Sequence, residues 1–355
     1  MSEDLQLSKH IYSREVEQVP IRNGYGEGLV IAGEADKNVV ALCADLTEST
    51  RTKDFADRFP ERFIQIGVAE QNLAAVASGM AAVGKVPFMT SYAMFSPGRN
   101  WEQIRTTICY NDQPVKIIGS HAGVSVGPDG ATHQAIEDLA IMRVLPNMTV
   151  IAPCDALEAK RATIAAASYP GPVYIRLARE KTPVMTTDRT QFTIGKSIVF
   201  REGKDVSIIV CGSLVYQAML AAQELETLGI QAEVVNMHTI KPIDEDQIIA
   251  SARRCGAIVT VEEHQVIGGL GSAVAEVLAK ELPTPQAFIG LQNRFGESGE
   301  PNELLEKFGL TAKFIVKAAR GVIQRKKRQH IELRNMYTPK KSKKPVPKKA
   351  VKKQA

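Results

Sequence analysis

The sequence predicts an α/β protein with two consecutive three-layer domains, each built around a mainly parallel sheet. Short β-branched runs alternate with helical segments along most of the chain. Its 355 residues suffice for two domains of ordinary size. The alternation is interrupted once, over residues 181–204. We therefore expect an N-terminal extension at 1–15, a first domain at 16–180, a linker at 181–204 and a second domain at 205–324.

The first domain is expected to begin with a glycine-interrupted helix over residues 20–34. Buried strands and helices follow in turn, as their apolar spacing indicates. The strands are expected at 39–44, 63–66, 86–92, 114–121, 149–153 and 173–177, and the further helices at 67–83, 100–109, 134–144 and 155–167. A glycine-rich loop leads from the strand at 114–121 to His133.

The second domain repeats the alternation. Strands are expected at 205–212, 232–237, 257–262 and 287–291, with helices at 214–228, after Pro242 and from Gly271. The segment Gly268-Gly-Leu-Gly271 partly matches a dinucleotide-binding loop, but Val274 stands at the position of the third glycine. A glycine-eased helix start explains this segment better than a nucleotide site.

Charge is distributed unevenly along the chain. Residues 325–355 contain thirteen Lys and Arg and one acid, a net charge of +12, so the rest carries −7 of the total +5. This basic tail lacks apolar periodicity, and we expect it to be disordered. It could contact nucleic acid or an acidic partner surface weakly, or serve only as a solubilising extension.

The composition also bears on location. No apolar run reaches the length of a membrane span, and Met1-Ser-Glu-Asp-Leu-Gln6 lacks the features of a secretion signal. Five scattered cysteines without a CxxC pair suit a reducing compartment. We expect a cytoplasmic protein without membrane contact.

Glu70 is the first candidate functional residue. The run Phe63–Ile66 stops at Gly67, and the helix that follows carries Glu70 in its first turn. An acid there can simply be a solvated charge that favours the helix dipole. Its apolar and alanine-rich neighbours instead indicate a partly buried carboxyl that could exchange a proton.

A second group of candidates lies in the glycine-rich loop. His121, Asp129 and His133 are accompanied by three glycines, which let a backbone approach a ligand closely. Imidazoles with a carboxylate bind sugar hydroxyls well. The same residues could hold a metal, but their spacing of eight and four in a loop makes this the weaker interpretation.

Four segments together resemble the transketolase family. They are Gly67-Val-Ala-Glu-Gln-Asn72, Cys43-Ala-Asp-Leu-Thr-Glu-Ser49, Thr90-Ser-Tyr-Ala-Met-Phe95 and the loop from His121 to Gln134. The resemblance covers residues ~15–320 and only the C-terminal half of a transketolase. It implies thiamine diphosphate as the cofactor, with Glu70 contacting its pyrimidine ring, Phe95 stacking on that ring and Tyr92 nearby.

The resemblance also implies roles for the polar residues. Asp129 and His133 would contact substrate hydroxyls, and His133 would take part in catalysis. His121, Arg22, Ser49 and Arg179 would hold the phosphate of a sugar phosphate. Asp45 is a further cofactor-binding candidate, because it follows a strand at the sheet edge where ligands bind.

One expected segment is missing. The transketolase family binds the diphosphate and Mg²⁺ through a Gly-Asp-Gly segment, and this sequence contains none. The resemblance therefore implies a split enzyme in which an N-terminal transketolase subunit supplies that half. Two copies of each subunit form the simplest closed assembly. Together they would transfer a two-carbon ketol unit between sugar phosphates, as in the pentose phosphate pathway.

Three alternatives stay open. A 1-deoxyxylulose-5-phosphate synthase-like subunit would share the loop, although that family usually carries arginine where His121 stands. A 2-oxo acid dehydrogenase beta subunit would share the two domains but fits the Asp129–His133 loop poorly. A scaffold protein with a degenerate site is disfavoured, because the residues of the resemblance are all present.

Overall fold

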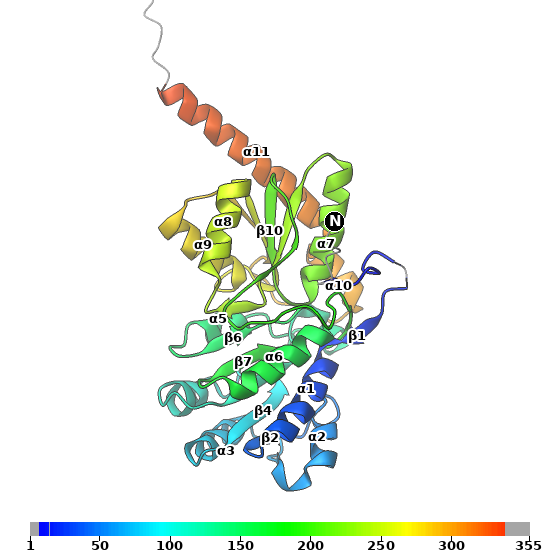
Figure 1. Ribbon diagram of the computed structural model, residues 1–355, viewed down its shortest axis with the longest axis vertical. Coiled ribbons are helices and arrows are strands. Elements are labelled where there is room, and N and C mark those ends of the chain that lie inside the picture. Colours follow the sequence, from blue (N-terminus) through cyan, green and yellow to red (C-terminus); the bar gives the residue numbers. More distant parts are fainter. Residues whose placement is uncertain (1–6, 14, 338–355) are drawn as a thin grey trace, which may run out of the picture.

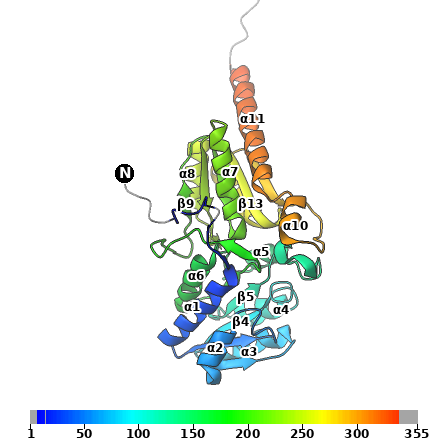
Figure 2. The same cartoon turned by 90° about the vertical axis from the view of Figure 1, so that its right-hand side faces the viewer.

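The computed structural model describes residues 7–13 and 15–337. Two α/β units lie one above the other, and the helix α11 (Ala312–Tyr337) extends away from the upper unit (Figure 1). Each unit is a sheet covered by helices on both sides, as the sequence predicts (Figure 2).

The strands and helices alternate along the chain. The strands are β1 (Gln18–Pro20), β2 (Val39–Cys43), β3 (Phe63–Gln65), β4 (Val86–Tyr92), β5 (Lys116–Ser120), β6 (Thr149–Ile151), β7 (Val173–Arg176), β8 (Lys181–Pro183), β9 (Ile198–Arg201), β10 (Val206–Val210), β11 (Ala232–Asn236), β12 (Thr239–Lys241), β13 (Ile258–Gln265) and β14 (Gln286–Leu291). The α-helices are α1 (Ile21–Ala35), α2 (Lys53–Arg58), α3 (Glu70–Ala82), α4 (Trp101–Gln103), α5 (Asp138–Arg143), α6 (Ala156–Ser168), α7 (Val215–Thr227), α8 (Glu245–Cys255), α9 (Leu270–Glu281), α10 (Pro301–Lys307) and α11. Short 3₁₀ segments η1 (Pro60–Arg62), η3 (Val124–Asp129) and η4 (Gly212–Leu214) and the π-helix η2 (Ile104–Cys109) complete the elements.

The strand order of the first sheet determines where the candidate site lies. Its strand order is β12-β6-β7-β5-β4-β2-β3, and every pair is parallel except β12 with β6. All five residues of β2 are buried, as expected for a strand covered on both faces. Because β2, β4 and β5 run parallel, their carboxyl ends meet at one edge of the sheet. The glycine-interrupted helix α1 packs closely on α6, since a Cβ at Gly24 would overlap the backbone of Ala156.

The second sheet has the order β14-β13-β10-β11-β9, parallel except at its edge strand β9. Both ends of α8 are capped by neighbouring residues. Asp244 caps α8 by accepting from the Gln247 N–H, and Gly256 ends that helix at φ 60°. Glu262 accepts from the N–H groups of Leu270 and Gly271 at 2.7 and 2.8 Å, so the glycine segment begins a helix capped by the protein's own carboxylate.

Residues 181–204 were predicted to be a linker, and this prediction is wrong in part. β8 pairs with β1 beside the first sheet, and β9 forms the edge of the second. β8 and β9 are only three and four residues long, and their partner strands are distant in sequence. The spacing of apolar residues therefore did not reveal them. The strand β12 escaped prediction for the same reason: it leaves the second unit to pair with β6 of the first.

Two predicted helices differ from the observed ones. The helix expected at 134–144 is limited to α5, because Ala135 forms a bridge with Ala122 and the Gln134 amide donates to three carbonyl groups. The helix expected at 100–109 is one turn of α4 that continues as the π-helix η2.

The basic tail was predicted to be disordered from residue 325, and residues 325–337 contradict this. They continue α11, where the Arg325 guanidinium donates to the Gln286 carbonyl at 2.7 Å and the Lys326 ammonium to the Cys255 carbonyl at 2.6 Å. Residues 338–355 lie outside the described part of the chain. Within the described part, no helix is long and apolar enough to cross a membrane.

Candidate active site

Glu70 is the first residue of α3 and lies at the carboxyl edge of the first sheet. Only 2 % of the residue is exposed. The Ser91 hydroxyl of β4 lies 3.5 Å from one carboxylate oxygen, and the Arg99 guanidinium lies 3.3 Å from the other. The Asn100 amide donates to the Glu70 carbonyl at 2.9 Å. The carboxyl is thus more fully buried than the partly buried group that the sequence indicated, and it forms an ion pair with Arg99.

Aromatic rings connect the end of β4 with the glycine-rich loop. The Tyr92 and Phe95 rings are stacked with centroids 6.5 Å apart. The centroids of the His121 and Tyr92 rings lie 4.0 Å apart. The His133 ring meets the Phe95 ring edge-on, with 5.3 Å between their centroids. The structure therefore brings together four residues that the sequence selected from two separate segments.

Two arginines continue the site beyond His121. Arg22, near the start of α1, lies 3.4 Å from the His121 ring and donates to the Arg179 carbonyl at 2.9 Å. Arg179 donates to the Val126 carbonyl at 2.6 Å and so fixes the loop. Three of the four residues expected to hold a phosphate are therefore neighbours.

The local charges act on His121. Burial, followed by the positive charges of Arg22 and Arg179, lowers the pKa of His121 to about 3. The imidazole is therefore neutral at pH 7. Ser120 shares a hydrogen bond with its Nδ1 at 2.9 Å, and the residue has a left-handed backbone at φ 58°. A non-glycine residue in this conformation needs such support from its surroundings.

Within residues 7–13 and 15–337, three candidates form no hydrogen bond or ion pair with this group. Asp129 is exposed at the end of η3. Asp45 is exposed after β2, with a left-handed backbone at φ 60°, and its N–H donates to the Gln65 side chain. Ser49 is half-buried in the same turn as Arg51, whose charge acts on Arg22.

Sequence reasoning missed Arg99 and Glu263. The Arg99 N–H donates to the Phe95 carbonyl at 2.9 Å, so one hydrogen-bonded turn joins the two residues, and their spacing of four residues is a weak signal of it in the sequence. Its guanidinium carbon lies 5.2 Å from the Phe95 ring centroid. Glu263 is buried in β13, and nothing local in the sequence connects it with the loop.

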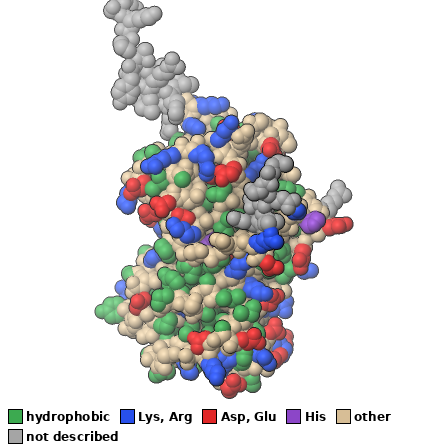
Figure 3. Space-filling model, in the orientation of Figure 1, with side chains coloured by type: hydrophobic (Ala, Val, Ile, Leu, Met, Phe, Trp, Pro, Cys, Tyr) green, Lys and Arg blue, Asp and Glu red, His purple; other side chains and the backbone are tan. Residues whose placement is uncertain are grey.

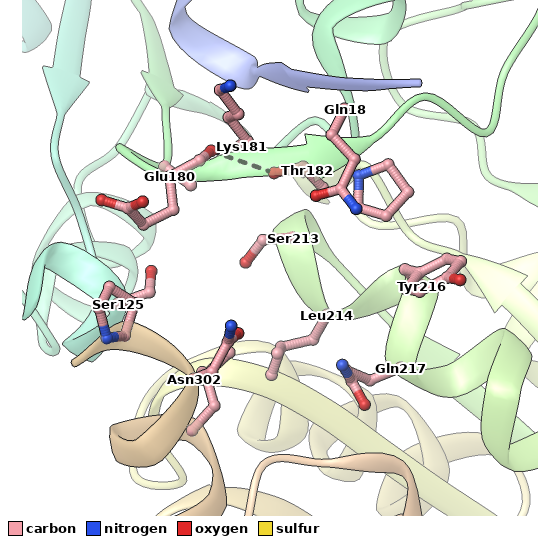
Figure 4. A pocket seen from close by; sticks show the side chains of 14 residues that line it. Gln18, Ser125, Glu180, Lys181, Thr182, Ser213, Leu214, Tyr216, Gln217 and Asn302 are labelled. Atoms are coloured by element: carbon pink, nitrogen blue, oxygen red, sulfur yellow. Dashed lines mark hydrogen bonds between the residues drawn. The ribbon is translucent and has the colours of Figure 1, made fainter. Parts of the chain in front are cut away.

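Glu263 fixes the loop from the second unit. Its carboxylate accepts from the Ser125 N–H at 2.6 Å and from the Ser213 hydroxyl at 2.9 Å. Beside these serines, a cavity of about 210 Å³ lies between the two units. Figure 4 shows Ser125, Ser213 and Asn302 of α10 around this cavity. The second unit thus positions the loop that carries His121 and His133.

The fold and the site define a protein of two α/β domains, the first of which carries a group of aromatic, acidic and basic side chains at the carboxyl edge of its sheet. Residues 17–185 match the family model of the transketolase pyrimidine binding domain, and residues 195–315 match that of the transketolase C-terminal domain. The chain belongs to the transketolase family, as the sequence segments indicated.

The similar proteins include chains of comparable length. The chain is 47% identical over 300 residues to a putative transketolase C-terminal section of Methanocaldococcus jannaschii, covering 84% of this chain and 94% of that protein. It is 43% identical to the 6-deoxy-6-sulfo-D-fructose transketolase subunit SqwH of Clostridium sp., with 88% of this chain and 97% of that protein covered.

Solved structures agree with these relatives. A split-gene transketolase, described as an inactive beta4 tetramer, is 49% identical with a TM-score of 0.82, covering 86% of this chain and 99% of that chain. The transketolase of Campylobacter jejuni is 25% identical with a TM-score of 0.73, covering 87% of this chain and 49% of that chain. This chain therefore corresponds to about half of that transketolase.

Proposed function

We propose that this chain is the C-terminal subunit of a split transketolase. In this proposal it acts with an N-terminal transketolase subunit to transfer a two-carbon ketol unit from a ketose phosphate to an aldose phosphate. The observation that carries the proposal is the continuous site of a buried carboxyl, two aromatic rings, two histidines and two arginines at one sheet edge. Relatives of comparable length are named as a transketolase C-terminal section and as a transketolase subunit, which supports the split arrangement.

The residues suit the pyrimidine half of thiamine diphosphate. Such a ring needs an apolar face and a hydrogen-bonding carboxyl at its edge, and the Tyr92–Phe95 pair and the buried Glu70 offer both. The cofactor, when bound, supplies the carbon nucleophile for ketol transfer. Glu70 would hold a proton at a carboxyl oxygen facing a ring nitrogen, in a site that excludes water.

The remaining residues suit the sugar phosphate. Arg22 and Arg179 would bind the phosphate, since guanidinium groups present several donors in one plane. Neutral His121 would add a hydrogen bond between them. His133 and Asp129 would contact hydroxyl groups, with His133 exchanging protons during the reaction. Ser49 and Asp45 are assigned to the phosphate and the cofactor by resemblance alone.

We assign the diphosphate and Mg²⁺ to the partner subunit, since this sequence lacks the Gly-Asp-Gly segment. Two copies of each subunit are the simplest closed assembly. Hydrophobic side chains gather on the face of the first unit that Figure 3 shows. The exposed large apolar residues of the described chain include Ile31 of α1 and Ile164 of α6. Exposed apolar surface of this kind is typical of protein contacts.

The test is reconstitution. Cofactor binding with Mg²⁺ would be measured by calorimetry, and ketol transfer by a coupled assay, on this chain with and without the N-terminal subunit. We expect tight binding and turnover only in the mixture. Full turnover by this chain alone would contradict the split arrangement.

The donor and acceptor are best tested as a panel. One relative is named for 6-deoxy-6-sulfo-D-fructose and another for apulose-4-phosphate, so relatives of this chain differ in substrate. The panel should pair ketose phosphates with aldose phosphates and include pyruvate with glyceraldehyde 3-phosphate. Turnover of the pyruvate pair alone would favour the 1-deoxyxylulose-5-phosphate synthase alternative.

A further inference from the structure

Arg99 lies where two features of the proposed cofactor site meet. Its guanidinium is 3.3 Å from the Glu70 carboxylate, and the guanidinium carbon is 5.2 Å from the Phe95 ring centroid. One cationic, planar group thus contacts both the carboxyl and an aromatic ring. A pyrimidine ring, which is also planar, would need the same two partners.

The backbone beneath Arg99 is held while its side chain is exposed. The Asn100 amide donates to the Glu70 carbonyl at 2.9 Å and to the Ser96 hydroxyl at 3.2 Å, which ties this turn to the start of α3. The Arg99 side chain nevertheless keeps 56% of its surface exposed, whereas that of Glu70 keeps 2%. The guanidinium can therefore move into solvent without disturbing the turn.

We propose that Arg99 is a positioning residue that occupies the pyrimidine site in the free chain and is displaced by the cofactor ring. This rests on the proposed function. The guanidinium pairs with Glu70 and covers Phe95 until a ring nitrogen and a ring face replace it. Until then, it keeps the buried carboxylate paired and correctly oriented.

The contact has the strength that displacement requires. An ion pair with one largely exposed partner contributes little, so a cofactor with its own contacts can compete with it. Removing the Arg99 charge should therefore tighten cofactor binding by about two- to fivefold, the range expected for such a pair. If Arg99 instead bound the cofactor directly, removing its charge would weaken cofactor binding.

The experiment uses the full chain assembled with its N-terminal subunit. The dissociation constant of thiamine diphosphate with Mg²⁺ is measured by calorimetry for wild type, Arg99→Met and Arg99→Lys. Arg105→Met is the matched control, since Arg105 is exposed on the adjoining η2 and loses the same charge. We expect tighter binding for Arg99→Met, and values near wild type for Arg99→Lys and the control.

A second measurement separates the contact from a general charge effect. In an assembly carrying Glu70→Gln, the further change Arg99→Met should no longer tighten binding, because the carboxylate has gone. In the free chain, the single tryptophan, Trp101, stands two residues from Arg99, and Arg99→Met should change its fluorescence more than Arg105→Met does.

The outcomes are distinct. Weaker or unchanged cofactor binding by Arg99→Met, beside a wild-type assembly that binds normally, would overturn this inference alone. An equal effect of Arg105→Met would overturn it as well. No cofactor binding by the wild-type assembly would instead count against the proposed function.

Discussion

Glu263 in the second domain accepts a hydrogen bond from the Ser125 N–H in the first, with 2.6 Å between oxygen and nitrogen. Both residues are buried, and the Ser213 hydroxyl donates a hydrogen bond to the other carboxylate oxygen of Glu263. A Cβ at Gly123, where φ is 91°, would overlap the same carboxylate. The loop with His121 and His133 therefore depends on a residue more than a hundred positions away.

The first prediction concerns this bond. Glu263→Ala should lower the free energy of unfolding by about 1–3 kcal/mol, because it leaves a buried N–H without an acceptor. It should also raise KM for sugar phosphate more than it weakens cofactor binding. Glu263→Gln keeps one carbonyl oxygen for Ser125 and should be milder in both. Equal effects of the two variants, measured by denaturant unfolding and steady-state kinetics, would argue against this role.

The second prediction is a proton uptake linked to phosphate. His121 is neutral because its pKa is lowered to about 3 by burial and by Arg22 and Arg179. A phosphate dianion between the arginines offsets their charge, so the pKa of His121 should rise on binding. At a pH between the free and bound values, binding should take up as much as about one proton per site.

Calorimetry with inorganic sulfate, a tetrahedral dianion that does not itself titrate between pH 6 and pH 8, measures this uptake in two buffers of different ionisation enthalpy. It should be larger at pH 6 than at pH 8, since protonation of the bound imidazole is favoured as pH falls. His121→Asn removes the titrating group while keeping a hydrogen-bonding side chain, and should abolish most of the difference. An uptake unchanged in that variant would assign the proton elsewhere.

The elements that the sequence predicted well have local causes. The buried run of β2 and the capped helix α8 follow from neighbouring residues, so their patterns are visible in the chain. The strands β8, β9 and β12 have distant partners, and each is three or four residues long. Their formation depends on tertiary pairing, which residue spacing does not reveal.

The site shows the same division. Glu70, Phe95 and His133 stood in recognisable segments, and the fold brought them to one edge. Arg99 carried a weak signal, its four-residue spacing from Phe95. Glu263 carried none, because its role comes from the packing of the second domain on the first.

The third prediction concerns Glu70. Glu70→Gln should leave the fold intact and reduce turnover by ~10²–10⁴-fold, the usual contribution of acid–base catalysis, because an amide cannot donate a proton as a carboxyl does. Exchange of the cofactor C2 proton for deuterium, followed by NMR, should slow in parallel. The exposed Glu102 offers a matched control in Glu102→Gln. Unchanged proton exchange in the Glu70 variant would remove this residue from the catalytic role.

The last prediction separates the end of α11 from the residues that follow it. Deleting residues 338–355 should leave kcat near wild type, because eight Lys residues and no apolar pattern offer little to pack. Deleting residues 326–355 also removes Lys326, whose ammonium donates to the Cys255 carbonyl at the end of α8 at 2.6 Å. That deletion should lower the free energy of unfolding by about 0.5–1.5 kcal/mol, the usual value of one hydrogen bond. Thermal and denaturant unfolding of both truncations, with kcat measured in the assembled enzyme, tests this difference. A large loss of kcat at low protein concentration in the shorter deletion would show instead that residues 338–355 support assembly.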